Sequence, residues 1–132
     1  MILIALYGTK EDHKLCLPLL RELPELTYRQ YKVITFDCYD AFIEDIAKTK
    51  YTMIIVVCDG AAGMEAVIAA KNLAPHTSIV WFTDDTDFGT QSYRLGCTYF
   101  DVKPLTHRKL SSALRLHGSK RIGNWNEKDI II

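Results

Sequence analysis

Residues 78–110 read SIVWFTDDTDFGTQSYRLGCTYFDVKPLTHRKL, and this stretch decides the fold. Two short runs in it, 79–82 and 99–102, are rich in β-branched and aromatic residues, as strands are. The first run ends at Thr83 and the second at Lys103-Pro104. We therefore predict two strands, one followed by a hydroxyl group and the other by an ammonium group.

A helix is expected after each of these strands. The first is short, over about 88–95, and Gly96 is placed as its C-cap. The second follows Thr106, a good N-cap residue, with Leu105 and Leu110 at the spacing of a hydrophobic staple. The stretch is thus a strand-helix-strand-helix unit.

The first 77 residues repeat this alternation. Apolar runs predict strands, whereas apolar residues spaced three or four apart predict helices. Thr9 and Asp12 form a capping box for the first helix, and Pro18 is expected to kink or shorten that helix. Residues 59–63 (DGAAG) are interpreted as a turn. The expected strands are 2–7, 32–36 and 53–58, and the expected helices are 9–23, 39–48 and 64–73.

Five strand-helix repeats in strict alternation require a parallel sheet with right-handed crossovers. The prediction is a flavodoxin-like, doubly wound α/β domain with strand order 2-1-3-4-5. Any ligand is then expected above the carboxyl ends of the first and third strands. We assign residues 1–117 to this domain. Residues 118–132 are expected to be a tail that forms an edge strand or begins an output domain.

Composition limits the classes of function. The chain has 132 residues, 48% of them apolar and 24% charged, and its formal net charge is zero. That balance gives no overall field to attract nucleic acid or an anionic membrane. The sequence has no run long enough to span a bilayer and no signal-peptide n-region, so we expect a cytoplasmic protein. The four cysteines are expected to be free thiols (Cys16, Cys38, Cys58 and Cys97).

The spacing from Thr83 to Pro104 resembles the last third of a response-regulator receiver domain of two-component signalling. The resemblance extends over about residues 1–117. In that family, an acidic pair after the first strand holds Mg²⁺, and an Asp that ends the third strand accepts a phosphoryl group from a histidine kinase. A Thr and a Lys then bind the phosphoryl oxygens. The resemblance implies phosphorelay signal transduction and regulation of transcription.

Several of the functional positions of the family are changed in this chain. Gly, Thr and Val side chains cannot hold Mg²⁺, which takes hard oxygen ligands, and Val cannot be phosphorylated. The resemblance therefore implies a pseudo-receiver, a non-enzymatic domain with no metal and no cofactor that acts through protein partners. The matching positions are Gly8 and Thr9 for the acidic pair, Val57 for the phosphoacceptor, Thr83 for the hydroxyl, Phe100 for the aromatic switch and Lys103 for the lysine.

Two other functions remain open. Asp59 is an alternative phosphoacceptor if the register of the third strand is shifted, although a turn residue before Gly60 is its ordinary role. A flavodoxin-like electron carrier is the other alternative, and it would bind the phosphate of FMN at the loop 7–9 and the helix that follows.

We also predict the contacts of the side chains at the carboxyl edge of the sheet. Lys103 is expected to extend over this edge towards the carboxylate of Asp59 or Asp84, because a half-buried ammonium without a partner is costly. Thr83 is expected either to cap the turn that follows it or to bind phosphate. The acids Asp84, Asp85 and Asp87 are expected to cap the next helix rather than bind a cation.

Protein association is the remaining prediction. Segment 32–56 resembles receivers that precede a LytTR-type DNA-binding domain, so DNA contact is expected only through an output domain that is not in this chain. A weak homodimer is expected through the face made by the helix 88–95, the strand 99–102 and the last helix. Its expected contact residues are Phe88, Tyr93, Tyr99 or Phe100, Arg108, Lys109 and Arg115.

Overall fold

Strands and helices alternate along residues 1–27 and 29–124, which the computed structural model describes. The strands are β1 (Ile2–Tyr7), β2 (Tyr31–Phe36), β3 (Met53–Val57), β4 (Ser78–Thr83) and β5 (Tyr99–Val102). The helices are α1 (Lys10–Arg21), α2 (Pro24–Thr27), α3 (Tyr39–Lys48), α4 (Gly60–Leu73), α5 (Gly89–Arg94) and α6 (His107–Asn124), with the 3₁₀ helix η1 (Thr86–Phe88) before α5.

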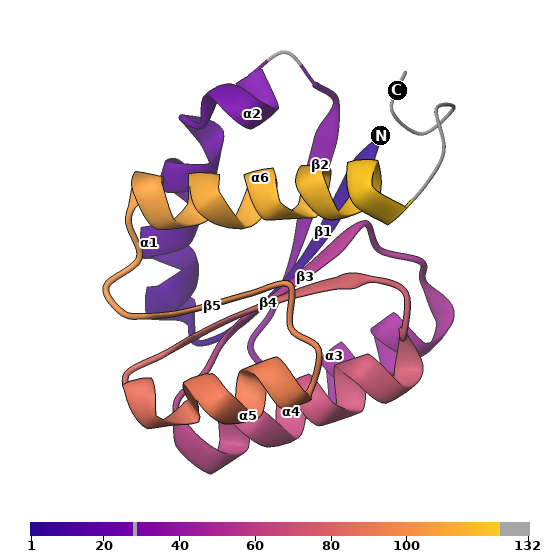
Figure 1. Ribbon diagram of the computed structural model, residues 1–132, viewed down its shortest axis with the longest axis vertical. Coiled ribbons are helices and arrows are strands. Elements are labelled where there is room, and N and C mark those ends of the chain that lie inside the picture. Colours follow the sequence, from indigo (N-terminus) through magenta and orange to yellow (C-terminus); the bar gives the residue numbers. More distant parts are fainter. Residues whose placement is uncertain (28, 125–132) are drawn as a thin grey trace.

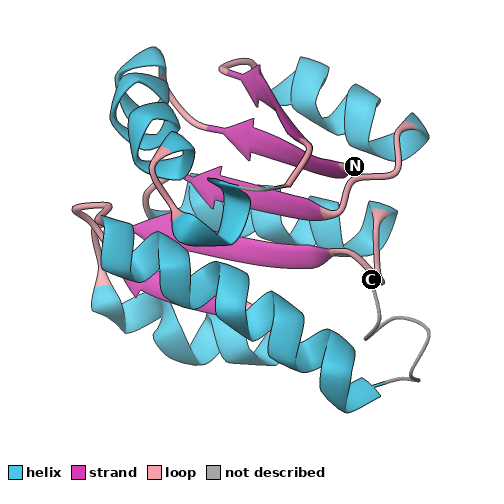
Figure 2. Ribbon diagram, turned by 90° about the horizontal axis from the view of Figure 1, so that it is seen from above, coloured by secondary structure: helices cyan, strands magenta, loops and turns pink. Residues whose placement is uncertain are grey.

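The five strands form one parallel sheet in the order β2-β1-β3-β4-β5, which confirms the predicted topology. Helices α1, α2 and α6 cover one face of the sheet, and α3, α4 and α5 cover the other (Figures 1 and 2). Because all strands are parallel, every strand-to-helix loop lies at the carboxyl edge and every helix-to-strand loop at the amino edge.

The central strands β3 and β4 are buried along their whole length, as the covering of both faces requires. Alternate residues of these strands enter two separate cores. Val57 and Phe82 pack into the core under α1 and α6, whereas Val56 and Trp81 pack into the core under α3 and α4. Trp81 is fully buried and is among the largest side chains of the interior.

The outer strand β5 pairs with β4 alone, and side chains occupy part of its free edge. The carboxylate of Asp101 accepts a hydrogen bond from the backbone N–H of Val102 at 2.8 Å. The ammonium of Lys109 donates to the Val102 carbonyl at 2.7 Å and to the Pro104 carbonyl at 3.1 Å. Both backbone groups of Val102 are therefore satisfied by side chains of the same chain.

The structure corrects several expected boundaries. Helix α4 begins at Gly60, so the predicted turn over 59–63 is its first helical turn. Helix α1 runs through Pro18 to Arg21, and the short α2 that follows was not predicted. The last helix extends to Asn124, beyond residue 117, where the domain was expected to end. The expected edge strand or output domain after that point falls largely on 125–132, outside the described residues.

None of the helices in the described part of the chain is both long enough and apolar enough to cross a membrane.

Candidate functional site

Lys103 crosses the carboxyl edge of the sheet. It lies in the loop after β5, and its Nζ is 3.1 Å from Oδ1 of Asp59 and 3.7 Å from Oδ1 of Asp12. The side chain of Asp12 is only 12% exposed, that of Lys103 is 27% exposed and that of Asp59 is 48% exposed. The ammonium therefore joins α1 to the β3–α4 loop in a half-buried setting.

The surroundings of Lys103 favour its charged form. Burial by itself lowers the pKa of an ammonium group. Here the hydrogen bond to Asp59 and the negative charges of Asp12, Asp59 and Asp84 outweigh burial, so the pKa of Lys103 is raised above its ordinary value of 10.5. The two carboxylates thus hold a permanent cation at neutral pH.

Asp59 is fixed by the end of β4 as well as by Lys103. Its Oδ1 accepts a hydrogen bond from the backbone N–H of Asp84 at 3.1 Å. The buried hydroxyl of Thr83 accepts from the N–H of Gly60 at 3.3 Å and donates to the Asp84 carboxylate at 3.4 Å. Gly60 has a φ of +60°, a left-handed conformation that glycine adopts readily, and it lets α4 begin directly after Asp59.

Asp12 reaches the site because it belongs to the capping box of α1. The hydroxyl of Thr9 accepts from the N–H of Asp12 at 3.1 Å, and the Asp12 carboxylate accepts from the N–H of Thr9 at 3.0 Å. The box turns the carboxylate back towards the start of the helix, where Lys103 lies. Gly8 makes room for this turn, since a Cβ there would lie 3.0 Å from the Val57 carbonyl oxygen and 3.2 Å from Asp12 Cβ.

A buried tryptophan holds the backbone next to Asp59 in place. The indole N–H of Trp81 donates to the carbonyl oxygen of Cys58 at 2.9 Å, directly before Asp59. Its ring packs edge-on against Phe100, with centroids 5.4 Å apart, and is tilted against Phe88 at 5.5 Å. Gly63 of α4 lies against both groups, and a Cβ there would lie 2.2 Å from the Cys58 oxygen and 2.8 Å from the indole nitrogen.

The predicted site residues separate into two groups. Thr9, Asp59, Thr83 and Lys103 meet at the carboxyl edge, directly or through Asp12, and Gly8 lies beside them. Two others lie apart, since Val57 is 1% exposed and packs in the core and Phe100 packs on Trp81.

The expected contact of Lys103 with Asp59 is confirmed, whereas the carboxylate that accompanies it is Asp12 rather than Asp84. Among the loop acids, Asp85 caps η1 by accepting from the N–H of Asp87 at 2.8 Å, whereas α5 begins after Phe88 without a side-chain cap, so the expectation that these acids cap that helix is wrong. Sequence reasoning did not place Asp12, Cys58 or Trp81 in the site. The capping box was a usable signal for Asp12, because it directs that side chain back to the carboxyl edge.

These contacts indicate whether the site could hold a metal ion or a flavin phosphate. Within the described part of the chain, no group of three or more His, Cys, Asp or Glu side chains is arranged to hold a metal ion. A flavin phosphate at the start of α1 would meet the Asp12 carboxylate, which already accepts a hydrogen bond from the N–H of Thr9. Like charges repel there, so the loop 7–9 is poorly suited to bind phosphate.

Comparison with known proteins supports the fold. No protein-family model and no curated protein matches this sequence. Among solved structures, a response regulator receiver domain protein from Clostridium thermocellum superposes with a TM-score of 0.69 at 17% identity, covering 92% of this chain and 98% of that one.

Two further structures are similar. A CheY-like receiver domain protein from Methanospirillum hungatei JF-1 has a TM-score of 0.69 at 15% identity and covers 92% of this chain and 99% of its own. The pilus assembly protein CpaE from Caulobacter crescentus CB15 has a TM-score of 0.67 at 16% identity, with coverages of 92% and 100%. These likenesses show that the chain has the fold of receiver domains.

Proposed function

We propose that this domain is a pseudo-receiver, a signalling module that works through protein association instead of phosphoryl transfer. One observation carries the proposal. The ammonium of Lys103 lies 3.1 Å from Asp59 and 3.7 Å from Asp12, so the lysine that binds a phosphoryl group in the receiver family is already neutralised by carboxylates of its own chain. A bound phosphoryl group would have to compete with both.

The positions that correspond to the phosphorylation chemistry support the same conclusion. Val57 is buried and has no nucleophilic atom, and Gly8 and Thr9 offer no carboxylate to a metal ion. Receiver phosphorylation needs Mg²⁺ to neutralise the charge that the phosphoryl oxygens bring. Here Lys103 supplies a single fixed positive charge, which the negative charges of the two carboxylates exceed.

Incubation with acetyl phosphate and Mg²⁺ should leave the intact mass of the protein unchanged. The reason is that Val57 has no nucleophilic atom and that Gly8 and Thr9 offer no carboxylate to Mg²⁺. Mass spectrometry of the intact chain measures the result, and the Asp59→Asn variant is the matched control. A gain of one phosphoryl group in the wild type that the control lacks would disprove the pseudo-receiver proposal.

The second candidate function is phosphoryl transfer to Asp59. The observation that favours it is that Asp59 is half-exposed and lies in contact with Lys103 and next to the Thr83–Asp84 turn. In this reaction an Asp59 oxygen would attack the phosphorus of acetyl phosphate, forming an acyl phosphate and releasing acetate. The same mass measurement decides between the two candidates.

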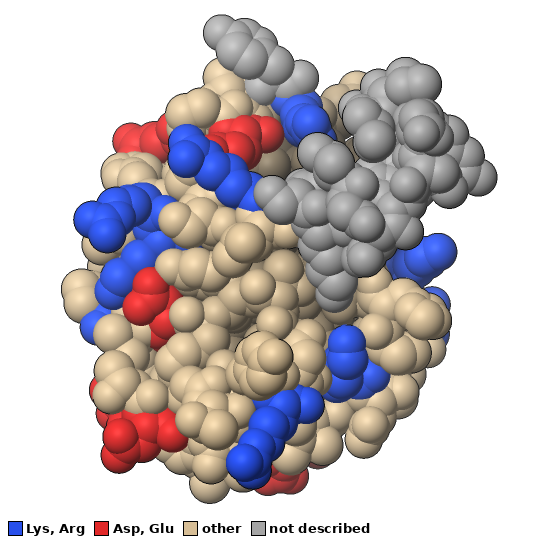
Figure 3. All heavy atoms as spheres, in the orientation of Figure 1, with Lys and Arg blue, Asp and Glu red and all other residues tan. Residues whose placement is uncertain are grey.

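In the pseudo-receiver proposal, signalling uses the face made by α5, β5 and α6, and any contact with DNA belongs to an output partner. Tyr93 on α5 is 84% exposed, and the side chain of Arg115 on α6 is 75% exposed. Basic side chains gather over the start of α6, and acidic ones lie where β4 passes into α5 (Figure 3). Exposed aromatic and arginine residues are typical of interfaces.

A weak homodimer through this face is expected, and it should not respond to beryllofluoride, because phosphorylation has no part in the association. Sedimentation velocity at several protein concentrations, with and without beryllofluoride and Mg²⁺, measures both properties. Tyr93→Ala should weaken the dimer, while Leu15→Ala, which trims an exposed side chain of α1, should leave it unchanged. A beryllofluoride-dependent shift would contradict this expectation, as would a strict monomer at high micromolar concentration.

A further inference from the structure

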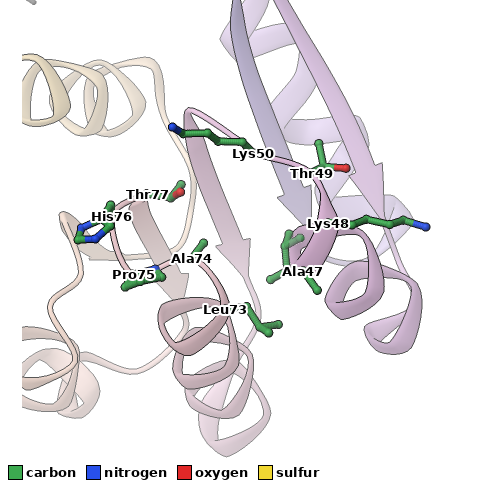
Figure 4. A pocket seen from close by; sticks show the side chains of 10 residues that line it. Ala47, Lys48, Thr49, Lys50, Leu73, Ala74, Pro75, His76 and Thr77 are labelled. Carbon is green, nitrogen blue, oxygen red and sulfur yellow. The ribbon is translucent and has the colours of Figure 1, made fainter.

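A hollow lies at the amino edge of the sheet, opposite the Lys103 site. It is formed by the last turns of α3 and α4 and by the loops that lead from them into β3 and β4 (Figure 4). Its volume is about 270 Å³. Small-molecule pockets usually measure roughly 300–1,000 Å³, so this hollow suits one or two side chains better than a cofactor. Ala47, Leu73 and Pro75 give it apolar walls.

The charged residues of the hollow are all basic. Lys48, Lys50 and His76 line it and no acidic residue does, although the chain as a whole has zero net charge. Lys48 is paired with Glu44 at 3.7 Å. Lys50 and His76 come from the two loops that flank the hollow (Figure 4), are exposed, and make no salt bridge or hydrogen bond to any residue that the structure describes. The hollow therefore fits a carboxylate with a small apolar body.

A segment with this chemistry lies at the opposite edge of the same fold. The loop from β4 to α5 carries Asp84, Asp85 and Asp87, of which Asp84 and Asp87 are exposed. Asp85 is used as the cap of η1, whereas the Asp87 carboxylate has no salt-bridge partner in the described part of the chain. Strand-to-helix and helix-to-strand loops lie at opposite edges of a parallel sheet, so one copy cannot bring its own acidic loop to its own hollow.

We propose that the amino-edge hollow binds the acidic loop 84–87 of a second copy of this chain, head to tail. Lys50 and His76 would receive the Asp87 carboxylate, and the methyl group of Thr86 would face Leu73 and Pro75. Such a contact joins two different surfaces, so a pair of bound copies keeps one free hollow at one end and one free loop at the other. The association therefore extends into short open chains, or into a ring where the geometry closes, rather than ending as a symmetric dimer. It is a different contact from the α5–β5–α6 face and does not depend on it.

Two charge reversals test the proposal, because each blocks one side of the contact and leaves the other side intact. Lys50→Glu alters the hollow, Asp87→Lys alters the loop, and Lys14→Glu, an exposed lysine of α1, is the matched control. Sedimentation velocity is run at about 20 mM and about 500 mM NaCl, which shortens the Debye length from roughly 20 Å to roughly 4 Å. The wild type should form species larger than a dimer, which grow with concentration, at low salt only.

Each reversal alone should weaken the association about tenfold or more, and the control should not. A mixture of the two variants should associate again, since the intact hollow of one variant meets the intact loop of the other and the two reversed charges are also opposite in sign. A monomeric wild type at low salt would overturn the proposal, and so would association that neither reversal changes. A dimer lost in Tyr93→Ala but kept in Lys50→Glu would support the α5–β5–α6 face and reject the head-to-tail contact.

Discussion

Replacing Gly63 by alanine should destabilise the domain by about 3 kcal/mol, the upper end of the usual range for overpacking a core. The new Cβ would lie 2.2 Å from the Cys58 carbonyl oxygen and 2.8 Å from the Trp81 indole nitrogen. The nearest atom belongs to the backbone, so no side-chain rotation relieves the clash. Helix α4 must move away from β3, and the Cys58–Trp81 hydrogen bond is then lost. Urea denaturation monitored by circular dichroism measures the change.

Gly89→Ala is the matched control for this prediction. Gly89 has helical dihedral angles, φ −57° and ψ −44°, and a Cβ there would meet Phe100 at an ordinary distance of 3.7 Å. Its stability should stay the same or rise by up to about 1 kcal/mol, because alanine loses less conformational entropy on folding. Adding Trp81→Phe to Gly63→Ala should recover only a small part of the loss. Full recovery would show that the indole, not the carbonyl, is the obstacle.

Lys103→Met should destabilise the domain by about 2 kcal/mol at neutral pH. This value lies between the loss for an exposed ion pair, below about 1 kcal/mol, and that for a buried pair that loses one partner, about 3–5 kcal/mol. An intermediate loss is expected because Asp12 is nearly buried while Asp59 is half-exposed. The variant leaves two carboxylates close together without a cation. Lys10→Met, at an 82% exposed side chain, should change stability by less than about 0.5 kcal/mol.

The pH dependence of this loss follows from the raised pKa of Lys103. A group whose pKa is higher in the folded state stabilises that state fully below its unfolded pKa, and the contribution disappears as the pH rises through the folded value. The difference between wild type and Lys103→Met should therefore be constant near neutral pH and shrink above the ordinary lysine value of 10.5. A difference that is unchanged there would contradict the ion-pair assignment. Adding Asp59→Asn to Lys103→Met should recover part of the stability at neutral pH, because one uncompensated charge is removed.

The sheet topology was predictable because it depends on local patterns. Each strand has an apolar run and each helix has a periodic stripe, and the parallel order follows from their alternation. The contact of Lys103 with Asp59 was predictable for a related reason. Both residues lie within two positions of the end of a parallel strand, so they lie at the same edge of the sheet, and a half-buried ammonium needs a carboxylate.

The errors have a common physical cause, which is that long-range contacts override local signals. The sequence DGAAG has the composition of a turn. Gly63 is nevertheless needed inside a helix, because the Cys58 carbonyl oxygen and the Trp81 indole lie so close to it that a Cβ would clash with both. Asp12 was recognised as a capping residue, but its second partner, Lys103, is far along the chain. Local spacing cannot show which distant side chain meets a cap.

The side chains at the outer edge of β5 limit how a partner can bind there. A free strand edge normally offers unpaired N–H and C=O groups to an incoming strand. Here the N–H of Val102 is bonded to the Asp101 carboxylate and its carbonyl to the Lys109 ammonium, so these two groups are not available. An extended peptide cannot be added to the sheet at this position without first breaking both bonds. Recognition at the end of β5 must therefore use side-chain shape and charge, and the same two bonds hinder the pairing of a strand from another molecule at this position.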